Sequence, residues 1–192
     1  HGTAEIRDHH VETLMNGGYK ALVKLRDEGV IKAFGAGVNV WEVCDILARR
    51  GDFDLFLLAG RYTLLEQESL RSLLPLCEER GIGIVLGGPY NSGILATGAT
   101  PKAVYNYSPA SKAIRDRVKA IEDVCRRHKV KLPEAALRFP LAHPCVVTVI
   151  PGGVTPKQVQ MNVKTLAAKI PKALWRELKD RGLLDQAAPT PR

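Results

Sequence analysis

The stretch VVTVIPGGVTPKQ, residues 146–158, contains the pattern that decides the fold class. Its first five residues, Val146 to Ile150, form a short apolar run that predicts a buried strand. A glycine-rich turn, Pro151-Gly152-Gly153-Val154, follows this run, and a helix is predicted to start at Thr155. The stretch therefore predicts one strand–turn–helix unit.

The same kind of unit recurs along the chain. Apolar runs predict three earlier strands, at residues 30–38, 53–59 and 82–86. Apolar residues at helical spacing predict helices between the strands, and glycines that end helices support this pattern. The helices are expected from Val11 to Gly29, from Trp41 to Arg50, from Leu70 to Gly81, from Ile114 to Cys125, and from starts at Pro133, Thr155 and Pro171.

The alternation of strands and helices narrows the fold class. Continuously apolar strands are typical of parallel sheets that are covered on both faces. Such a chain can form a doubly wound sheet or a (β/α)8 barrel. Only four strands are visible in 192 residues, and the chain opens on a helix, whereas a barrel typically needs eight strands and about 250 residues. We therefore expect an α/β fold that is the C-terminal part of a (β/α)8 TIM barrel. Strands 5–8 and their helices would form one partial domain over residues 1–192, with the N-terminal half absent.

Composition excludes several classes of protein. No apolar run is long enough to span a membrane, and the N-terminus does not look like a signal peptide. The cysteines, Cys44, Cys77, Cys125 and Cys145, have no metal-ligand spacing, and unpaired thiols favour a reducing, cytoplasmic compartment. Residues 110–192 carry 17 Lys and Arg against 7 Asp and Glu, so nucleic-acid binding is an alternative. The basic run at residues 126–129 is better interpreted as a solvated helix end.

Two glycine-rich turns are candidate phosphate-binding sites. They are residues 87–93 after the third strand and residues 151–155 after the fourth. Glycines let backbone amides approach an anion closely, and a helix dipole adds favourable charge. Gln158 and Asn162 share one face of the helix that starts at Thr155. They could contact a ligand, but Gln158 could instead complete a capping box with Thr155, and spacing alone favours that alternative.

The sequence also resembles a known family. Residues 149–162, VIPGGVTPKQVQMN, look like the cofactor-binding segment of the aldo-keto reductases. Residues 135–144, AALRFPLAHP, resemble the family's seventh helix, and residues 87–95, GGPYNSGIL, resemble the family's loop after strand seven. Within the family, the last segment and LAGRYTLLEQ at 58–67 are similar to D-threo-aldose 1-dehydrogenases and L-fucose dehydrogenases, with pyridoxal 4-dehydrogenases close by.

This resemblance implies an NAD(P)-dependent oxidoreductase that acts on a sugar hemiacetal or an aldehyde. A non-catalytic dinucleotide-binding or interaction module on the same scaffold is the alternative. No nucleic acid or membrane partner is expected. The resemblance implies cofactor contacts at Asn39, Gly88, Pro89, Tyr90, Asn91, Ser92, Gly93, Ile150, Pro151, Gly152, Gly153, Val154, Thr155, Gln158 and Asn162.

The family's catalytic Asp, Tyr, Lys and His are expected upstream of this chain, and His1 is interpreted as a residue beyond that histidine. The chain alone is therefore expected to be inactive. Some NADP-preferring relatives carry Lys and Arg at the positions of Gly152 and Gln158. Both residues are uncharged here and offer no charge-assisted bond to a 2′-phosphate. The cofactor is accordingly expected to be NAD or NADP, with NAD favoured.

Overall fold

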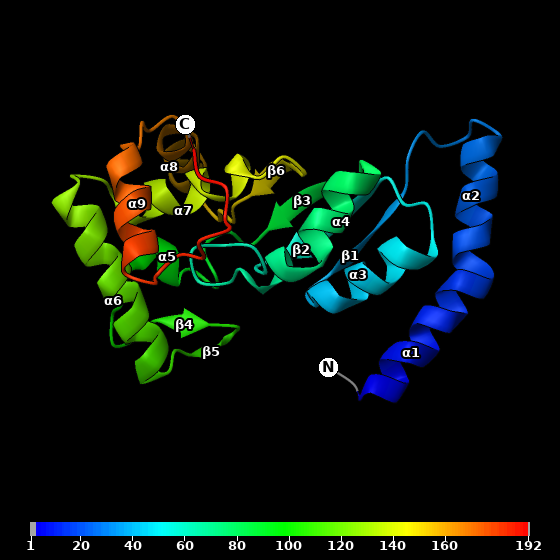
Figure 1. The fold of residues 1–192 in the computed structure, drawn as a ribbon, viewed down its shortest axis with the longest axis horizontal. Coiled ribbons are helices and arrows are strands. Elements are labelled where there is room, and N and C mark those ends of the chain that lie inside the picture. The colour runs from blue at the N-terminus through cyan, green and yellow to red at the C-terminus, as the bar shows by residue number, and fades with distance from the viewer. Residues whose placement is uncertain (1–2, 192) are drawn as a thin grey trace.

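The computed structural model describes residues 3–191, which form a four-stranded parallel sheet with helices around it (Figure 1). His1 lies outside the described residues. The strands are β1 (Gly35–Val38), β2 (Leu55–Ala59), β3 (Gly83–Gly87) and β6 (Val146–Ile150). They pair in the order β1-β2-β3-β6, and every pairing is parallel. The predicted four strands, their sequence order and their direction are therefore confirmed.

Helices connect the strands as the apolar spacing predicts. One long helical segment precedes β1, and it lies at the opposite end of the molecule from α6 and α9 (Figure 1). The helices are α1 (Ala4–Thr13), α2 (Tyr19–Asp27), α3 (Trp41–Arg50), α4 (Leu73–Arg80), α5 (Ile94–Thr97), α6 (Lys112–Arg127), α7 (Leu132–Arg138), α8 (Pro156–Leu166) and α9 (Lys172–Asp180), with the π-helical segment η1 (Leu14–Gly18) and the 3-10 helices η2 (Glu68–Arg71) and η3 (Pro140–Ala142).

Two glycines end helices as the sequence predicts. Gly29 and Gly81 both adopt left-handed backbone conformations, with φ of 72° and 67°. In each turn the next amide closes a wide hydrogen-bonded loop, from Val30 to the Leu25 carbonyl and from Ile82 to the Cys77 carbonyl. Glycine suits these positions because it has no Cβ to clash with the preceding turn.

An ion-pair cluster fixes the first helical segment against the sheet. The Asp54 carboxylate accepts a hydrogen bond from Arg26 Nη1 at 3.0 Å and another from the Phe34 amide at 2.8 Å. The Arg26 guanidinium also lies 4.7 Å from the centre of the Phe34 ring. The end of α2 is thereby held beside the start of β1 and β2.

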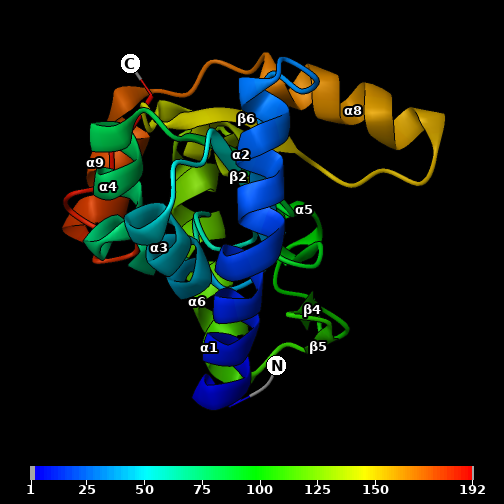
Figure 2. The ribbon, with the colours of Figure 1, turned by 90° about the vertical axis from the view of Figure 1, so that its right-hand side faces the viewer.

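The sheet is covered unequally on its two faces. Phe56, Leu58, Ile84 and Leu86 are buried on one face, against which α3 and α4 pack (Figure 2). Side chains on the other face are more exposed, and the exposed fraction reaches 39% at Leu57 and 62% at Val147. The expectation that both faces are covered is therefore wrong for the described residues.

The four strands do not close into a barrel. The four strands form an open sheet, and its edge strands β1 and β6 pair with no further strand between residues 3 and 191. Apolar runs followed by helices indicate that the strands are parallel. They do not indicate how many strands the sheet contains or whether it closes into a barrel. The structure also contains a small hairpin, β4 (Val104–Tyr105) with β5 (Ser108–Pro109), that the sequence did not predict.

The basic run at residues 126–129 lies at the end of α6, as the helix-end interpretation predicts. Arg127 and His128 both pair with Glu177 of α9, and Arg126 pairs with Asp123 on its own helix. Arg126, Arg127 and His128 thus have carboxylate partners within the described chain. No helix among residues 3–191 is both long and apolar enough to cross a membrane.

The backbones of β1 and β2 approach each other closely at Gly35, and a substitution there tests the pairing of these strands. A Cβ added at Gly35 would lie 1.9 Å from the Leu55 carbonyl oxygen, a backbone atom that cannot move without breaking the pairing. We expect Gly35→Ala to lower the free energy of unfolding by roughly 2–3 kcal/mol, as overpacking does. Urea denaturation followed by circular dichroism measures this change.

Gly37→Ala is the matched control on the same strand. Its added Cβ would have its nearest contact, Leu57 Cβ, at an ordinary 3.7 Å, so its stability should change by less than about 1 kcal/mol. Equal effects of the two substitutions would contradict the close approach.

Candidate functional site

The carboxyl ends of the four strands lie at one edge of the sheet because all pairings are parallel. The segments that leave this edge are Asn39 after β1, residues 60–66 after β2, residues 88–93 after β3 and residues 151–155 after β6. In open α/β sheets, ligands bind outside the carboxyl ends of the strands. This edge is therefore where the functional groups should be sought.

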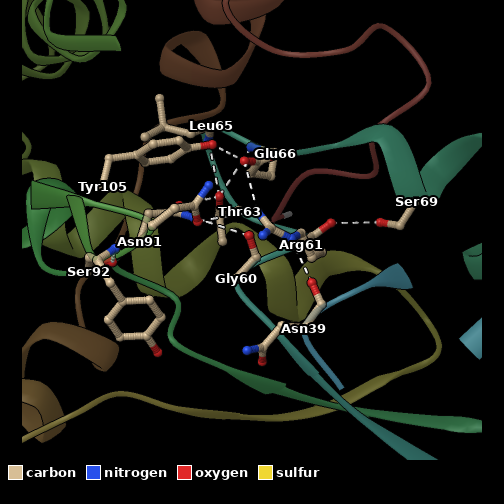
Figure 3. A network of polar contacts seen from close by, with 12 residues as sticks. Asn39, Gly60, Arg61, Thr63, Leu65, Glu66, Ser69, Asn91, Ser92 and Tyr105 are labelled. Carbon is tan, nitrogen blue, oxygen red and sulfur yellow. Dashed lines mark hydrogen bonds and ion pairs between the residues drawn. The ribbon is translucent and has the colours of Figure 1, made fainter. Parts of the chain in front are cut away.

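Asn91 joins the turns after β2 and β3. Its side chain is buried, and its amide nitrogen donates to the Gly60 carbonyl at 3.1 Å. Its amide oxygen accepts a 2.5 Å hydrogen bond from the hydroxyl of buried Thr63. That hydroxyl in turn accepts from the amides of Leu65 and Glu66, at 3.1 and 3.2 Å (Figure 3). One amide side chain thus fixes two turns that are distant in sequence.

Arg61 forms a second polar centre beside this network. Its Nε donates to the Asn39 carbonyl at 2.9 Å, and its Nη1 lies 3.2 Å from Glu66 Oε1 (Figure 3). The same Nη1 contacts the Asn106 side-chain oxygen at 3.3 Å, and the Tyr105 hydroxyl donates to Glu66. Burial raises the pKa of Glu66 and opposes the effect of Arg61. Arg61 therefore links β1, the turn after β2 and the β4–β5 hairpin.

Loop 88–93 also contacts the start of α8. The Tyr90 hydroxyl donates to the Asn162 side-chain oxygen at 3.2 Å. Burial raises the pKa of Tyr90 to about 12, so this hydroxyl keeps its proton at neutral pH. The amide nitrogen of Asn162 donates to the Gly152 carbonyl at 3.1 Å. A chain of two hydrogen bonds thus connects the glycine-rich turns after β3 and β6.

Gln158 stabilises the second glycine-rich turn, much as the capping alternative predicts. Thr155 is the N-cap of α8, and its hydroxyl accepts from the Gln158 amide at 3.3 Å. The Gln158 side-chain oxygen reaches back one residue further than expected and accepts from the Val154 amide at 2.7 Å. The amides of Gly152 and Gly153 donate no hydrogen bond to any residue in the described range.

The structure sorts the residues singled out in the sequence into two groups. Asn39, Gly88, Asn91 and Ser92 line one hollow together with Ala59, Gly60, Arg61, Asn106 and Tyr107. The second group surrounds the start of α8 and consists of Tyr90, Gly152, Val154, Thr155, Gln158 and Asn162. Pro89 and Gly93 continue loop 88–93, Gly153 continues the second turn, and Ile150 and Pro151 carry β6 into it.

Sequence reasoning missed Arg61, Glu66, Asn106 and Tyr107 as members of the hollow or its frame. Arg61 and Glu66 lie in the segment 58–67, which resembles the aldose dehydrogenases, but their contacts depend on the fold around them. Asn106 and Tyr107 form a hairpin turn, for which Asn-Gly is the strongest short-range signal. With tyrosine in place of glycine, that signal is weak.

Comparison with known proteins identifies the family. The model of the aldo/keto reductase family matches residues 6–181. The chain belongs to the aldo/keto reductase family. This match confirms the resemblance found in the sequence. It also corrects the prediction of a domain without its N-terminal half, because the family's model matches nearly the whole chain.

Curated relatives support the branch of the family that the sequence indicates. The chain is 40% identical over 185 residues to the D-threo-aldose 1-dehydrogenase of a Pseudomonas species, covering 95% of this chain and 55% of that protein. It is 38% identical over 182 residues to the pyridoxal 4-dehydrogenase of Microbacterium luteolum, covering 94% of this chain and 53% of that protein. The chain thus spans about half the length of these two relatives.

Solved structures show the same fold. An aldo-keto reductase from Bacillus halodurans in its holo form matches with a TM-score of 0.69 and 25% identity, over 91% of this chain and 57% of that one. A glycerol dehydrogenase from Gluconobacter oxydans matches with a TM-score of 0.69 at 18% identity, over 94% of this chain and 57% of that one. The second likeness concerns the fold alone.

The Asn91 network predicts an unequal effect of two similar substitutions. Thr63→Val keeps the shape of a fully buried side chain but leaves Asn91 and two backbone amides without their hydroxyl partner. We expect it to lower the free energy of unfolding by about 1–3 kcal/mol, the usual penalty for unsatisfied buried polar groups. Chemical denaturation gives this value directly.

Thr97→Val serves as the control, because the Thr97 hydroxyl is exposed and donates only to the Gly93 carbonyl. Its effect should stay within about 0.5 kcal/mol. A Thr63→Val protein as stable as the wild type would show that the network does not hold the two turns.

Proposed function

We propose that this chain binds the nicotinamide dinucleotide of an NAD(P)-dependent oxidoreductase that acts on a sugar hemiacetal or an aldehyde. Family membership supports this proposal, because aldo-keto reductases use nicotinamide cofactors. The names of the two curated relatives support the substrate class. The proposal includes residues 1–192 as a single domain and, given four buried free cysteines, a cytoplasmic location.

The observation that carries the proposal is the connection between the two glycine-rich turns. Tyr90, Asn162 and Gly152 hold loop 88–93 beside the start of α8. The amides of Gly152 and Gly153 are free to donate at a helix N-terminus, a typical arrangement for phosphate binding. These residues therefore fit the pyrophosphate end of a dinucleotide, and Gln158 and Asn162 would lie beside its adenosine.

The nicotinamide ring of such a cofactor takes up a hydride from the carbon that is oxidised. The role proposed for this chain is to bind and orient the cofactor through the fifteen residues that the sequence singles out. Asn39, which lines the same hollow as Ser92, would contact the nicotinamide end. A non-catalytic binding module remains the alternative function for the same residues.

We also propose that the chain alone does not oxidise aldoses. In this family the acid/base residue is a tyrosine beside a lysine. Among residues 3–191, no hydrogen bond joins a tyrosine hydroxyl to a lysine. Tyr62 has a buried hydroxyl without a partner, and Tyr19 accepts from the Asp52 amide. The absence of NADH formation from L-fucose and the purified chain is the expected result.

Cofactor choice can be tested at Gln158. The wild-type chain should bind NAD at least as tightly as NADP, because neither Gly152 nor Gln158 offers a cation to the 2′-phosphate. Gln158→Arg should strengthen NADP binding by about tenfold relative to NAD, the size of one charge-assisted hydrogen bond. Calorimetric titration with both cofactors measures the ratio.

Gln158→Met separates charge from loss of the turn contact. It removes the acceptor for the Val154 amide without adding charge, so it should weaken both cofactors equally. Lys157→Ala tests the neighbouring cation. A wild-type preference for NADP that survives Lys157→Ala would contradict this account, and a chain that binds neither cofactor would overturn the proposed function.

A further inference from the structure

The tip of the β4–β5 hairpin carries a strained aromatic residue. Val104 pairs with Pro109 and Tyr105 with Ser108, so Asn106 and Tyr107 form a two-residue turn. Both adopt positive φ, 49° and 63°, as a type I′ turn requires. Glycine is the preferred residue at the second position, because a large side chain is disfavoured in the left-handed region. Tyr107 therefore occupies a position where tyrosine is unfavourable.

Packing within the chain does not explain this tyrosine. Its side chain is 88% exposed and belongs to no apolar cluster. Backbone strain that is not compensated by packing is common where a residue contacts a ligand. An exposed aromatic face beside polar groups is also a typical binding surface.

The hairpin tip is nevertheless held firmly over the strand ends. The Tyr107 amide donates to the Ser92 hydroxyl at 3.1 Å. The Asn106 side-chain oxygen accepts from Arg61 at 3.3 Å. The Tyr105 hydroxyl donates to Glu66 (Figure 3). Contacts to the turn after β2 and to the loop after β3 thus hold the backbone that carries the exposed ring.

The hollow beside Tyr107 is lined by polar groups that still have free hydrogen-bonding capacity. Within residues 3–191, the Nη2 group of Arg61 and the side-chain amide of Asn39 have no hydrogen-bond partner. The neighbouring backbone of Gly60 and Gly88 carries no side chain that would fill the space. A guanidinium with a free donor group, next to one aromatic face, matches a ligand with several hydroxyls and one apolar ring face.

We propose that Tyr107 and Arg61 form the recognition site for the ring of an aldose. The C–H face of the sugar would lie on the Tyr107 ring, and its hydroxyls would bind Arg61, next to the nicotinamide end of the cofactor at Asn39. This inference rests on the proposed function and names the residues that select its substrate.

The experiment measures the affinity of the full chain for L-fucose by saturation-transfer NMR, with and without saturating NAD. Tyr107→Gly should weaken L-fucose binding by about three- to tenfold, the contribution of one aromatic contact. Because glycine suits the turn, the melting temperature should not fall. Tyr107→Phe keeps the ring and should retain sugar binding, and NAD affinity should be unchanged in both variants.

The ring face is tested with a second ligand. L-Fucitol has the hydroxyls of L-fucose but no ring, so it should bind the wild type more weakly and respond little to Tyr107→Gly. Equal binding of L-fucose to wild type and Tyr107→Gly would overturn the inference, as would no detectable binding to the wild type. A loss of NAD affinity instead would assign the hairpin to the cofactor.

Pyridoxal is the competing ligand, since one relative is named for it. Pyridoxal binding that depends on Tyr107, without L-fucose binding, would replace the sugar in this inference. The NAD titration tests the proposed function separately from the sugar-binding experiment. A chain that binds L-fucose through Tyr107 but no NAD would reject the proposed function alone, whereas one that binds NAD but no sugar would reject only the recognition site.

Discussion

The side chain of Asn91 connects two turns that lie next to each other only after the sheet has formed. It bonds to Thr63, 28 residues earlier, and to the carbonyl of Gly60. Both partners follow β2, whereas Asn91 follows β3. Because the amide is buried, its donor and acceptor must both be satisfied. This requirement fixes the relative position of the two turns, and with it the frame around which the candidate site is built.

The two turns that Asn91 connects contact different parts of the molecule. Toward β1, the turn after β2 presents Arg61, which contacts Asn39 and the hairpin tip. Toward α8, the loop after β3 presents Tyr90, which reaches Asn162. The same short loop thus lines a polar hollow with Ser92 and contacts a helix N-terminus with Tyr90. A ligand that extends along the strand ends could contact both regions without any change in the sheet.

The local pattern of the sequence predicts the strands and helices of this arrangement, but not the open edges of the sheet or the polar contacts around the site. Strands such as residues 146–150 and the glycine stops at Gly29 and Gly81 depend on neighbours in sequence, so local periodicity identifies them. Whether the sheet closes depends on which edges meet, and no local pattern encodes that. Arg61 and Asn106 meet across 45 residues. Their pairing needs the hairpin, whose tip lacks the expected glycine.

Gln158 and Asn162 illustrate why a structural and a functional interpretation of one residue need not exclude each other. Both side chains bond to the backbone of the turn they follow, at Val154 and Gly152. These bonds hold the turn while the amides of Gly152 and Gly153 keep their donors free. A turn that is already ordered loses less conformational entropy when an anion binds. The capping contacts therefore provide the preorganisation that a binding role requires.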